Sequence, residues 1–358
     1  MIIRGAAGLV WWLCVAGLFA WALGRVFTDR YLWSQYCFWL PSVVVVPGVA
    51  AGLATSWAVL WWSGPRGPRN PGATRAAVAV ILAVVLSFVY VVAVEQRRLT
   101  PRPAPASRPF VVVHWNATDR PGDEWVRRVL DQAPDVIVIN PATGQVWDAL
   151  IEQYKPVTKI WQYGFVIFSR HRALRFGYQI LGVDEGVGFD PRTGRSRAKR
   201  RDPGRAMLLQ LDTTAALGAP TTYWLIDLPS DISLHRRVVV EEAAEALRNF
   251  DGQVIDFDAD GTAHRASRGG RGFPPPDVIL GDFNIPRGSG SLARLGADLV
   301  PAYSVAGRGM CATWPYERPL WHLDQMLVNP HWRIADYRAF DPGGGTHMGQ
   351  RLIIDAAK

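Results

Sequence analysis

The segment Asp277-Val278-Ile279-Leu280-Gly281-Asp282-Phe283-Asn284 is the most informative part of this chain. Three prolines precede it and an apolar run fills its first half, a pattern typical of a buried strand that ends in a tight turn. Asp282 and Asn284 lie two positions apart, so both side chains fall on one face of the strand end. There they can hold a metal-bound phosphate or aim a water molecule at it. Asp and Asn also form ordinary turns, so the rest of the chain decides between the two interpretations.

Strands and helices are predicted on both sides of this segment, from Phe110 onward. The predicted strands are 110–114, 135–139, 164–168, 223–227, 278–281, 325–328 and 352–354, and the predicted helices are 125–132 and 235–250. The second helix shows clear helical periodicity of its apolar residues. Such a series predicts an α/β sandwich in which sheets are packed inside helices.

The bulk composition leaves several classes of function open. The 358 residues leave room for about two domains, and the net charge of +8 is carried almost entirely by arginine. Arginine suits contact with phosphate, whether in nucleic acid, in lipid headgroups or in a small substrate. The three cysteines form neither a disulfide framework nor a zinc-binding spacing.

Three apolar stretches occupy the first hundred residues, at about 6–24, 37–62 and 76–94. Each has the length of roughly 20 residues that a membrane-spanning helix needs, and tryptophans lie near the segment ends, as in an interfacial belt. The arginines on the two sides nearly balance, so the positive-inside rule does not decide which side of the membrane the soluble part faces.

The chain is therefore predicted to have three parts. Residues 1–96 form a membrane region with about three transmembrane α-helices, and residues 97–109 form a linker rich in proline and arginine. Residues 110–358 form the globular domain. Within it, the segment 192–205 is strongly basic, which is consistent either with a solvated insertion or with a clamp on anionic lipid headgroups or a polyphosphate.

Several short motifs of the soluble part follow one another in a recognisable order. They are Val113-His114-Trp115-Asn116, Pro134-Asp135-Val136-Ile137-Val138, Gly164-Phe165-Val166-Ile167-Phe168-Ser169-Arg170, Asp227-Leu228-Pro229-Ser230, Gly281-Asp282-Phe283-Asn284, Thr313-Trp314-Pro315, Leu323-Asp324-Gln325-Met326-Leu327-Val328 and Thr346-His347. This order resembles the endonuclease/exonuclease/phosphatase superfamily of metal-dependent phosphoesterases, over roughly Phe110 to the C-terminus. The resemblance implies a two-sheet α/β sandwich.

Membrane spans ahead of such a domain resemble the bacterial glycopeptide (vancomycin/teicoplanin) resistance branch. This second resemblance implies action on undecaprenyl pyrophosphate outside the membrane.

The resemblance implies catalytic roles for five residues. Asn116 matches an asparagine near the metal and the phosphate, and Asp282 matches the residue that orients or deprotonates the attacking water. Asn284 matches a phosphate ligand, and His347 matches the histidine that contacts the scissile phosphate. Asp324 matches the carboxylate that orients this histidine, and such a pair favours the imidazolium form.

Substrate and metal residues follow from the same resemblance. Trp314 and Arg318 resemble the loop on the substrate side. The expected cofactor is Mg²⁺ or Mn²⁺, with Asn116, Asp227 and Asp282 as the ligand set.

Three positions depart from the family pattern. Pro141 stands where the family has a metal-binding glutamate, Asp227 stands where a histidine precedes Leu-Pro, and Thr346 stands where an aspartate precedes the final histidine. Magnesium needs oxygen ligands, usually including a carboxylate. Asp227 could replace the missing charge, and Asn140 could supply a neutral oxygen.

The leading hypothesis is a membrane-anchored, metal-dependent phosphohydrolase that acts on a lipid-linked phosphate or pyrophosphate, with its soluble domain outside the cytoplasm. One alternative is a degenerate domain that binds a phosphate-bearing ligand without turnover, and metal binding separates the two. A nuclease is a further alternative, although no aromatic and basic stripe marks a nucleic-acid path. A function of the membrane part itself ranks last, because its spans contain no buried ionisable residue. The histidines at 114, 235, 264 and 322 are interpreted as structural or surface residues.

Overall fold

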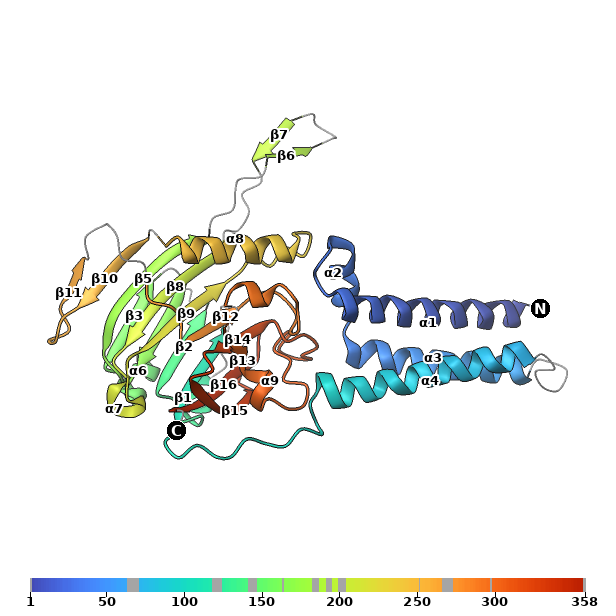
Figure 1. Cartoon of the computed structure of the whole chain (residues 1–358), viewed down its shortest axis with the longest axis horizontal. Coiled ribbons are helices and arrows are strands. Elements are labelled where there is room, and N and C mark those ends of the chain that lie inside the picture. Colours follow the sequence, from blue (N-terminus) through green and yellow to red (C-terminus); the bar gives the residue numbers. More distant parts are fainter. Residues whose placement is uncertain are drawn as a thin grey trace. The chain divides into compact units, whose positions relative to one another are not determined.

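The computed structural model describes residues 2–62, 71–117, 124–140, 147–162, 164–181, 187–190, 195–198, 204–250, 252–265, 273–296 and 298–356 (Figure 1). Pro141 and most of the basic segment 192–205 lie outside these residues. The chain divides into two compact units, Met1–Pro101 and Arg102–Lys358, and each is described by itself.

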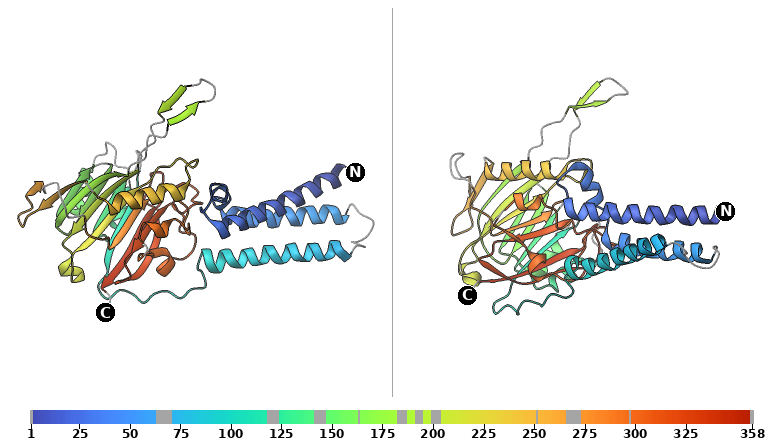
Figure 2. Two further views of the ribbon diagram at one scale, coloured as in Figure 1. Left: turned by 45° about the horizontal axis from the view of Figure 1, so that its top comes forward. Right: turned by 45° about the vertical axis from the view of Figure 1, so that its right-hand side comes forward.

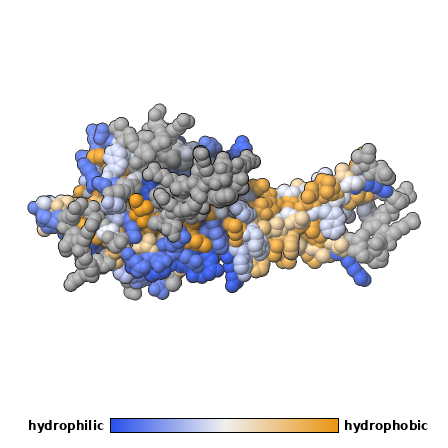
Figure 3. All heavy atoms as spheres, turned by 90° about the horizontal axis from the view of Figure 1, so that it is seen from above, coloured by the Kyte–Doolittle hydropathy of each residue, from blue (hydrophilic) through white to orange (hydrophobic). Residues whose placement is uncertain are grey.

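The first unit is helical. It contains α1 (Ile2–Phe27), α2 (Leu32–Phe38), α3 (Ser42–Trp62) and α4 (Pro71–Tyr90), which a short π-helix η1 (Val91–Glu95) extends. Three helical segments are long and apolar enough to cross a membrane, at Ile3–Phe27, Ser42–Trp62 and Thr74–Glu95. Many of their large apolar side chains are exposed, which gives this unit the apolar surface visible in Figure 3.

A polar cluster joins one end of α1 to the end of η1. The Arg25 guanidinium lies 2.9 Å from a carboxylate oxygen of Glu95 and donates to the hydroxyl of Ser42, which in turn donates to Glu95. Both charged side chains are largely buried. The pair lies one residue beyond the predicted spans 6–24 and 76–94, where the helices continue. Mutual neutralisation lowers the cost of placing both charges in an apolar unit.

The second unit is a sandwich of two mixed sheets (Figure 2). The six-stranded sheet has the order β15-β16-β1-β2-β4-β3. Its strands are β1 (Phe110–Asn116), β2 (Val136–Asn140), β3 (Thr158–Gln162), β4 (Phe165–Ser169), β15 (Trp332–Phe340) and β16 (Gly349–Ala356). The predicted fold class is thereby confirmed.

The eight-stranded sheet has the order β11-β10-β5-β8-β9-β12-β14-β13. Its strands are β5 (Ala173–Leu181), β8 (Gly204–Leu211), β9 (Thr221–Asp227), β10 (Gln253–Phe257), β11 (Ala263–Arg265), β12 (Val278–Asp282), β13 (Val300–Pro301) and β14 (Asp324–Val328). A separate hairpin pairs β6 (Val187–Asp190) with β7 (Arg195–Ala198). All seven predicted strands overlap observed ones.

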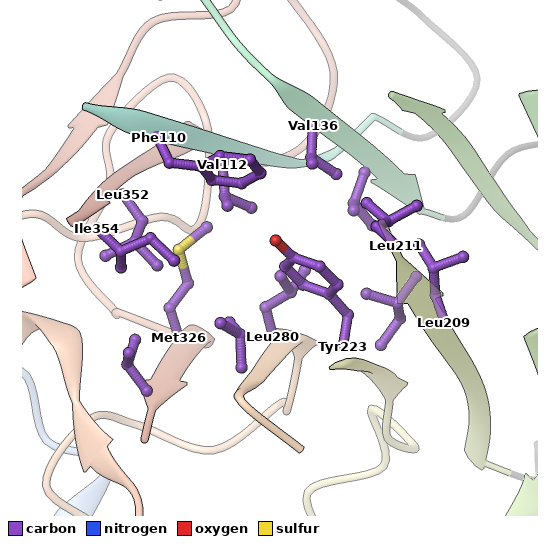
Figure 4. Close-up of a cluster of buried hydrophobic side chains, with 14 of the residues drawn as sticks. Phe110, Val112, Val136, Leu209, Leu211, Tyr223, Leu280, Met326, Leu352 and Ile354 are labelled. Atoms are coloured by element: carbon purple, nitrogen blue, oxygen red, sulfur yellow. The ribbon is translucent and has the colours of Figure 1, made fainter. Parts of the chain in front are cut away.

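The core between the two sheets is built by alternate residues of the central strands. Successive side chains of a strand point to opposite faces, so Val112 of β1 and Leu280 of β12 face the same interior (Figure 4). Tyr223 of β9 and Met326 of β14 join them, and all four are almost fully buried. The strands of this core carry apolar residues on both faces because helices cover the outer face of each sheet.

Helices complete the layers. Helix α8 (Arg236–Arg248) packs Val240, Ala243 and Leu247 on the outer face of the eight-stranded sheet, and helices α5 (Trp125–Leu130) and α6 (Asp148–Tyr154) cover the six-stranded one. Shorter helical segments are α7 (Thr214–Leu217), η2 (Leu292–Arg294) and α9 (Ala302–Ala306). The helices predicted at 125–132 and 235–250 correspond to α5 and α8.

Gly281 is the position where the predicted strand-to-turn segment tolerates no side chain. Its φ is +144°, and a Cβ atom there would lie 1.8 Å from the carbonyl oxygen of Ile226 on the neighbouring strand. We expect Gly281→Ala to lower the free energy of unfolding by about 3 kcal/mol, from backbone strain and overpacking together. Gly261→Ala is the matched control, since φ is +85° there but no atom lies within 4 Å. Equal losses in urea denaturation of the two variants would contradict this account.

Candidate active site

Strand register brings three carboxylates to one end of the eight-stranded sheet. Asp227, Asp282 and Asp324 are register partners at the ends of β9, β12 and β14. Each lies an even number of positions from a residue of the inter-sheet core, such as Leu280 or Met326, so all three belong to the inner face. The polar site therefore continues the apolar core at the point where the strands end.

Asp282 lies at the centre of this group and is almost fully buried. One carboxylate oxygen accepts a hydrogen bond from the backbone N–H of Asn284 (2.9 Å), and the other accepts one from the side-chain amide of Asn116 on β1 (2.7 Å). Burial and the nearby charge of Asp324 raise the pKa of Asp282 to about 6, although His347 and these hydrogen bonds oppose the shift. Asp282 is therefore ionised at neutral pH and basic enough to accept a proton.

Asp324 and His347 form a buried ion pair. The Nδ1 atom of His347 lies 2.7 Å from a carboxylate oxygen of Asp324. Burial alone would raise the pKa of Asp324, but the charge and hydrogen bond of His347 outweigh it and hold that pKa below its usual range. Burial would lower the pKa of His347, yet the charges of Asp324, Asp282 and Asp227 raise it to about 9. His347 is thus an imidazolium at neutral pH, and its Nε2 atom lies 3.9 Å from Asp282.

The loop before His347 is held against β1. Trp115 donates its indole N–H to the backbone carbonyl of His347 (3.2 Å). A Cβ atom at Gly345, where φ is +85°, would lie 2.7 Å from the carbonyl of Ala117 and about as close to Trp115. On the other side, the N–H of Met348 donates to the carbonyl of Thr313 (2.8 Å). The close approach at Gly345 fixes where the imidazole can lie.

The remaining predicted residues are placed less centrally. Asn284 adopts a left-handed φ of +50°, and its side-chain amide donates to the carbonyl of Leu228 (2.8 Å), which ties together the turns after β9 and β12. Trp314 is half-buried, and its ring centroid lies 5.2 Å from that of Trp321. Arg318 is exposed. The structure thus brings Asn116, Asp282, Asp324 and His347 into one cluster and leaves these residues around it.

Only some of the donor atoms in this cluster suit a hard divalent cation. Asp282, Asp324 and His347 have ligand atoms within 4.8 Å of one another, but a protonated His347 whose Nδ1 atom already binds Asp324 is no metal ligand. The amide oxygen of Asn116 is buried and has no hydrogen-bond partner among the described residues. Together with the Asp282 carboxylate it offers the oxygen donors that Mg²⁺ or Mn²⁺ prefers. Asp227 is half-buried on the adjacent strand, outside the group of three.

Asn140 does not supply the free oxygen that was expected of it. Its Oδ1 atom lies 2.5 Å from Nε2 of His114, which leaves the amide nitrogen as the atom without a partner in the described part of the chain. The reason is that His114 and Asn140 both belong to the inner face of adjacent strands, a pairing that sequence distance conceals. Pro141, the other departure on this strand, lies outside the described residues.

A second layer of polar side chains beneath the cluster was missed. His114 is fully buried, with Nδ1 3.1 Å from Gln350 and 3.9 Å from Asp324. Gln350 donates to the backbone carbonyl of Asp324 (2.8 Å), and His322 lies 2.7 Å from the hydroxyl of Tyr337. Of the two interpretations of these histidines, structural or surface, His114 and His322 fit the structural one. The sequence feature that could have indicated this layer is His114, a histidine two positions before Asn116 in an otherwise apolar strand.

The protonation of His347 gives a direct prediction. In metal-free protein the imidazole is expected to keep its proton until about pH 9, because the Asp324 carboxylate stabilises the cation. Long-range ¹H–¹⁵N NMR of histidine-labelled protein measures this titration, and His347→Gln identifies the resonance. A midpoint near 6.5, the usual histidine value, would show that the buried pair does not form.

The sequence of the soluble unit matches one known protein family. A family profile described as "Endonuclease/Exonuclease/phosphatase family" matches residues 114–347. No curated protein matches the sequence at a significant level. Similar solved structures include an endonuclease/exonuclease/phosphatase family protein from Bacteroides thetaiotaomicron (13% identity, TM-score 0.43, covering 72% of this chain and 100% of that one). A mannosyl-6-phosphatase of Bacteroides thetaiotaomicron VPI-5482 (13%, 0.44, 68% and 99%) and D. rerio TDP2 complexed with a single-strand DNA product (13%, 0.45, 69% and 99%) are also similar.

Proposed function

The chain belongs to the endonuclease/exonuclease/phosphatase family, and from that premise we propose that it is a membrane-anchored, metal-dependent phosphohydrolase of a lipid-linked phosphate or pyrophosphate. The observation that carries the proposal is the buried series Asp324–His347–Asp282. It places a proton acceptor and a cationic proton donor 3.9 Å apart at the end of the sandwich. A base for the attacking water and a cationic donor for the phosphoryl oxygens both accelerate hydrolysis of a phosphate ester.

In the proposed reaction, Asp282 takes a proton from a water molecule as the water oxygen attacks phosphorus. The bond from phosphorus to the leaving oxygen breaks and its electron pair stays on that oxygen. With a lipid-linked pyrophosphate, the leaving group departs as the lipid monophosphate anion and inorganic phosphate is released. His347 donates a hydrogen bond from Nε2 to a phosphoryl oxygen and stabilises the charge that develops there, while Asp324 keeps the imidazole protonated and oriented. Asn284 lies at the turn that follows Asp282 and contacts the phosphate as it enters.

Asn116 and Asp282 would hold a bound Mg²⁺ or Mn²⁺, with Asp227 as the next carboxylate in the row. When bound, the cation supplies Lewis-acid stabilisation of the phosphoryl oxygens. Because the amide nitrogen of Asn116 donates to Asp282, the amide oxygen of Asn116 is the atom left to bind a cation.

The membrane part supports a substrate that resides in a bilayer. Helices that can cross a membrane end at Glu95, and the first strand begins at Phe110. An extended connection of that length spans at most about 50 Å, so the domain stays near the membrane surface. We infer a multi-pass protein with its soluble domain on the outer face, as the glycopeptide-resistance branch implies. Protease added to intact spheroplasts should cleave this domain, and protection until lysis would place it in the cytoplasm.

Phosphate release from undecaprenyl pyrophosphate in detergent tests the proposed function. The full-length protein is assayed with and without Mg²⁺ or Mn²⁺, beside Asp282→Ala. Release that depends on the metal and is lost in the variant would support the hydrolase. Binding of the substrate without release, at any metal concentration, would support the degenerate binding domain instead. A DNA substrate in parallel covers the nuclease alternative.

A further inference from the structure

The exposed large apolar side chains of the soluble unit gather at the end of the sheets that carries Asp282. Six such side chains occur among the described residues of Arg102–Lys358, with exposed fractions of 39–66%. Four of them lie at the Asp282 end, namely Trp161, Ile180, Ile232 and Val238. Val157 lies beside the opposite end of β3, and Val305 lies in α9, two residues from Tyr303, whose ring packs against His322. Exposed apolar groups that cluster in this way mark an interaction surface.

Strand register fixes two of the four positions. Ile180 on β5 belongs to the same row of register partners as Asp282 on β12, with β8 and β9 between them. Three strand spacings separate the two residues by about 14 Å. Trp161 on the edge strand β3 occupies the equivalent row of the other sheet, three strands from Trp115, which contacts the His347 loop.

The other two positions lie in the connection after β9 and at the start of α8. Ile232 follows Asp227 by five residues, in the connection between β9 and α8, and is 52% exposed. Val238 lies in the first turn of α8 and is 42% exposed. We call Trp161, Ile180, Ile232 and Val238 the apolar rim, since they flank the candidate active site on both sheets.

Positive charge accompanies the apolar rim. Arg205 lies in the row between Ile180 and Asp227, and its guanidinium reaches the turn between β3 and β4, 2.7 Å from where a Cβ of Gly164 would be. Apolar side chains that include a tryptophan, beside a cation such as Arg205, favour an interface of anionic lipid.

We propose that the apolar rim is a membrane-contact surface that inserts its side chains into the headgroup region of a bilayer containing anionic lipid. The partner is the bilayer to which the chain is tethered. Arg333 donates to the carbonyls of Ala104 and Pro105 at the end of the soluble unit opposite Asp282, so the free connection from Glu95 spans at most about 32 Å. That reach exceeds the roughly 23 Å length of β1, which joins this end to the active-site end. Insertion brings the mouth of the site to headgroup depth, where a lipid-linked phosphate resides. The proposal rests on the proposed function only in taking the chain to be membrane-anchored.

Site-directed spin labelling tests the contact without requiring turnover. The full-length chain, with its three native cysteines replaced by alanine, receives one cysteine at position 161, 180 or 232 and is reconstituted in vesicles of phosphatidylcholine mixed with phosphatidylglycerol. Val157→Cys is the matched control, because Val157 is 66% exposed and lies beside the other end of β3. Thermal unfolding of each labelled variant checks that the fold is retained.

For each label, the ratio of its collision rate with oxygen to its collision rate with a water-soluble nickel complex is measured. We expect this ratio to be severalfold higher at the three rim positions than at position 157. Equal ratios at all four positions would overturn the proposal. Labels at the rim that are shielded from both reagents would show that protein covers the surface, for example a second copy of the chain, and would also overturn it. Since no catalysis is measured, failure of phosphate release leaves this result interpretable.

Discussion

Replacing Asp282 with asparagine is expected to abolish turnover while it stabilises the soluble unit. The variant keeps the size of the side chain but cannot accept the proton of the attacking water, so kcat should fall by a factor on the order of 10³. Asp282 is nearly buried, and its pKa of about 6 shows that its charge is unfavourable in the folded state. Removing that charge is worth about 3 kcal/mol at pH 8. The asparagine loses about 1 kcal/mol of this, because its amide nitrogen cannot accept one of the two hydrogen bonds from Asn116 and Asn284, so the free energy of unfolding should rise by about 2 kcal/mol.

The pH dependence of this gain follows from the sign of the shift. A carboxyl group whose pKa is raised by folding destabilises the protein fully above the folded value and not at all below the unfolded one. In chelator-treated protein, the gain of Asp282→Asn should therefore shrink as the pH is lowered from about 6 to about 4. Denaturant unfolding at several pH values measures it.

Asp277→Asn is the matched control for Asp282→Asn. Asp277 precedes the same strand at its opposite end and is also largely buried, where it accepts hydrogen bonds from the N–H of Thr222 (2.7 Å) and from Trp332 (3.1 Å). Its replacement should lower stability and leave kcat unchanged. If Asp282→Asn instead lost stability as Asp277→Asn does, misfolding would explain its inactivity and the catalytic assignment would fail.

The central strands were predictable because burial on both faces makes them continuous apolar runs that end in polar residues. Strands β1, β2, β9, β12 and β14 all have this form, and their last or first residues make up most of the candidate site. The edge strands β3, β11, β13 and β15 were not predicted, and neither were β5, β8 and β10 inside the eight-stranded sheet. Strand β3, with Lys159, Trp161 and Gln162 exposed, has no core on its outer face to demand an apolar pattern.

The hydrogen bonds within the site could not be predicted from the sequence, because they join residues that are far apart along the chain. Asn116 and Asp282 are 166 positions apart, and only the packing of the two sheets shows that the amide of one binds the carboxylate of the other. In the same way, Asn140 appeared free to bind a metal until His114 proved to occupy its oxygen. Arg205 carried no motif, and only strand register places it beside Asp227.

Asp324→Asn is expected to cause a loss of activity as large as that of Asp282→Asn, but by a different route. Asparagine can still accept the hydrogen bond from Nδ1 of His347, yet it lacks the charge that keeps the imidazole protonated. The pKa of His347 should then fall below 7, because burial opposes the cation once its counterion is gone. At pH 8 the neutral ring stabilises a phosphoryl oxygen poorly, and kcat should fall on the order of 10³-fold.

Two measurements separate this route from simple structural damage. Lowering the pH returns the proton to His347, so the ratio of kcat at pH 6 to kcat at pH 8 should rise severalfold in Asp324→Asn relative to the unchanged protein. The NMR titration of His347 in the same variant should show the lowered pKa directly. A variant with low activity but with the His347 midpoint still near 9 would contradict the role given to Asp324.

The stability effects of the two aspartate variants should have opposite signs. Folding raises the pKa of His347 to about 9, so the Asp324 pair stabilises the protein fully below about pH 6.5, and this stabilisation is lost as the pH rises through 9. Asp324→Asn should therefore cost about 3 kcal/mol at pH 6 and much less at pH 10, whereas Asp282→Asn should stabilise at pH 8. The two buried carboxylates on either side of His347 therefore have opposite effects on stability. The fold stabilises the ionised form of Asp324 and destabilises the ionised form of Asp282, which acts as the base.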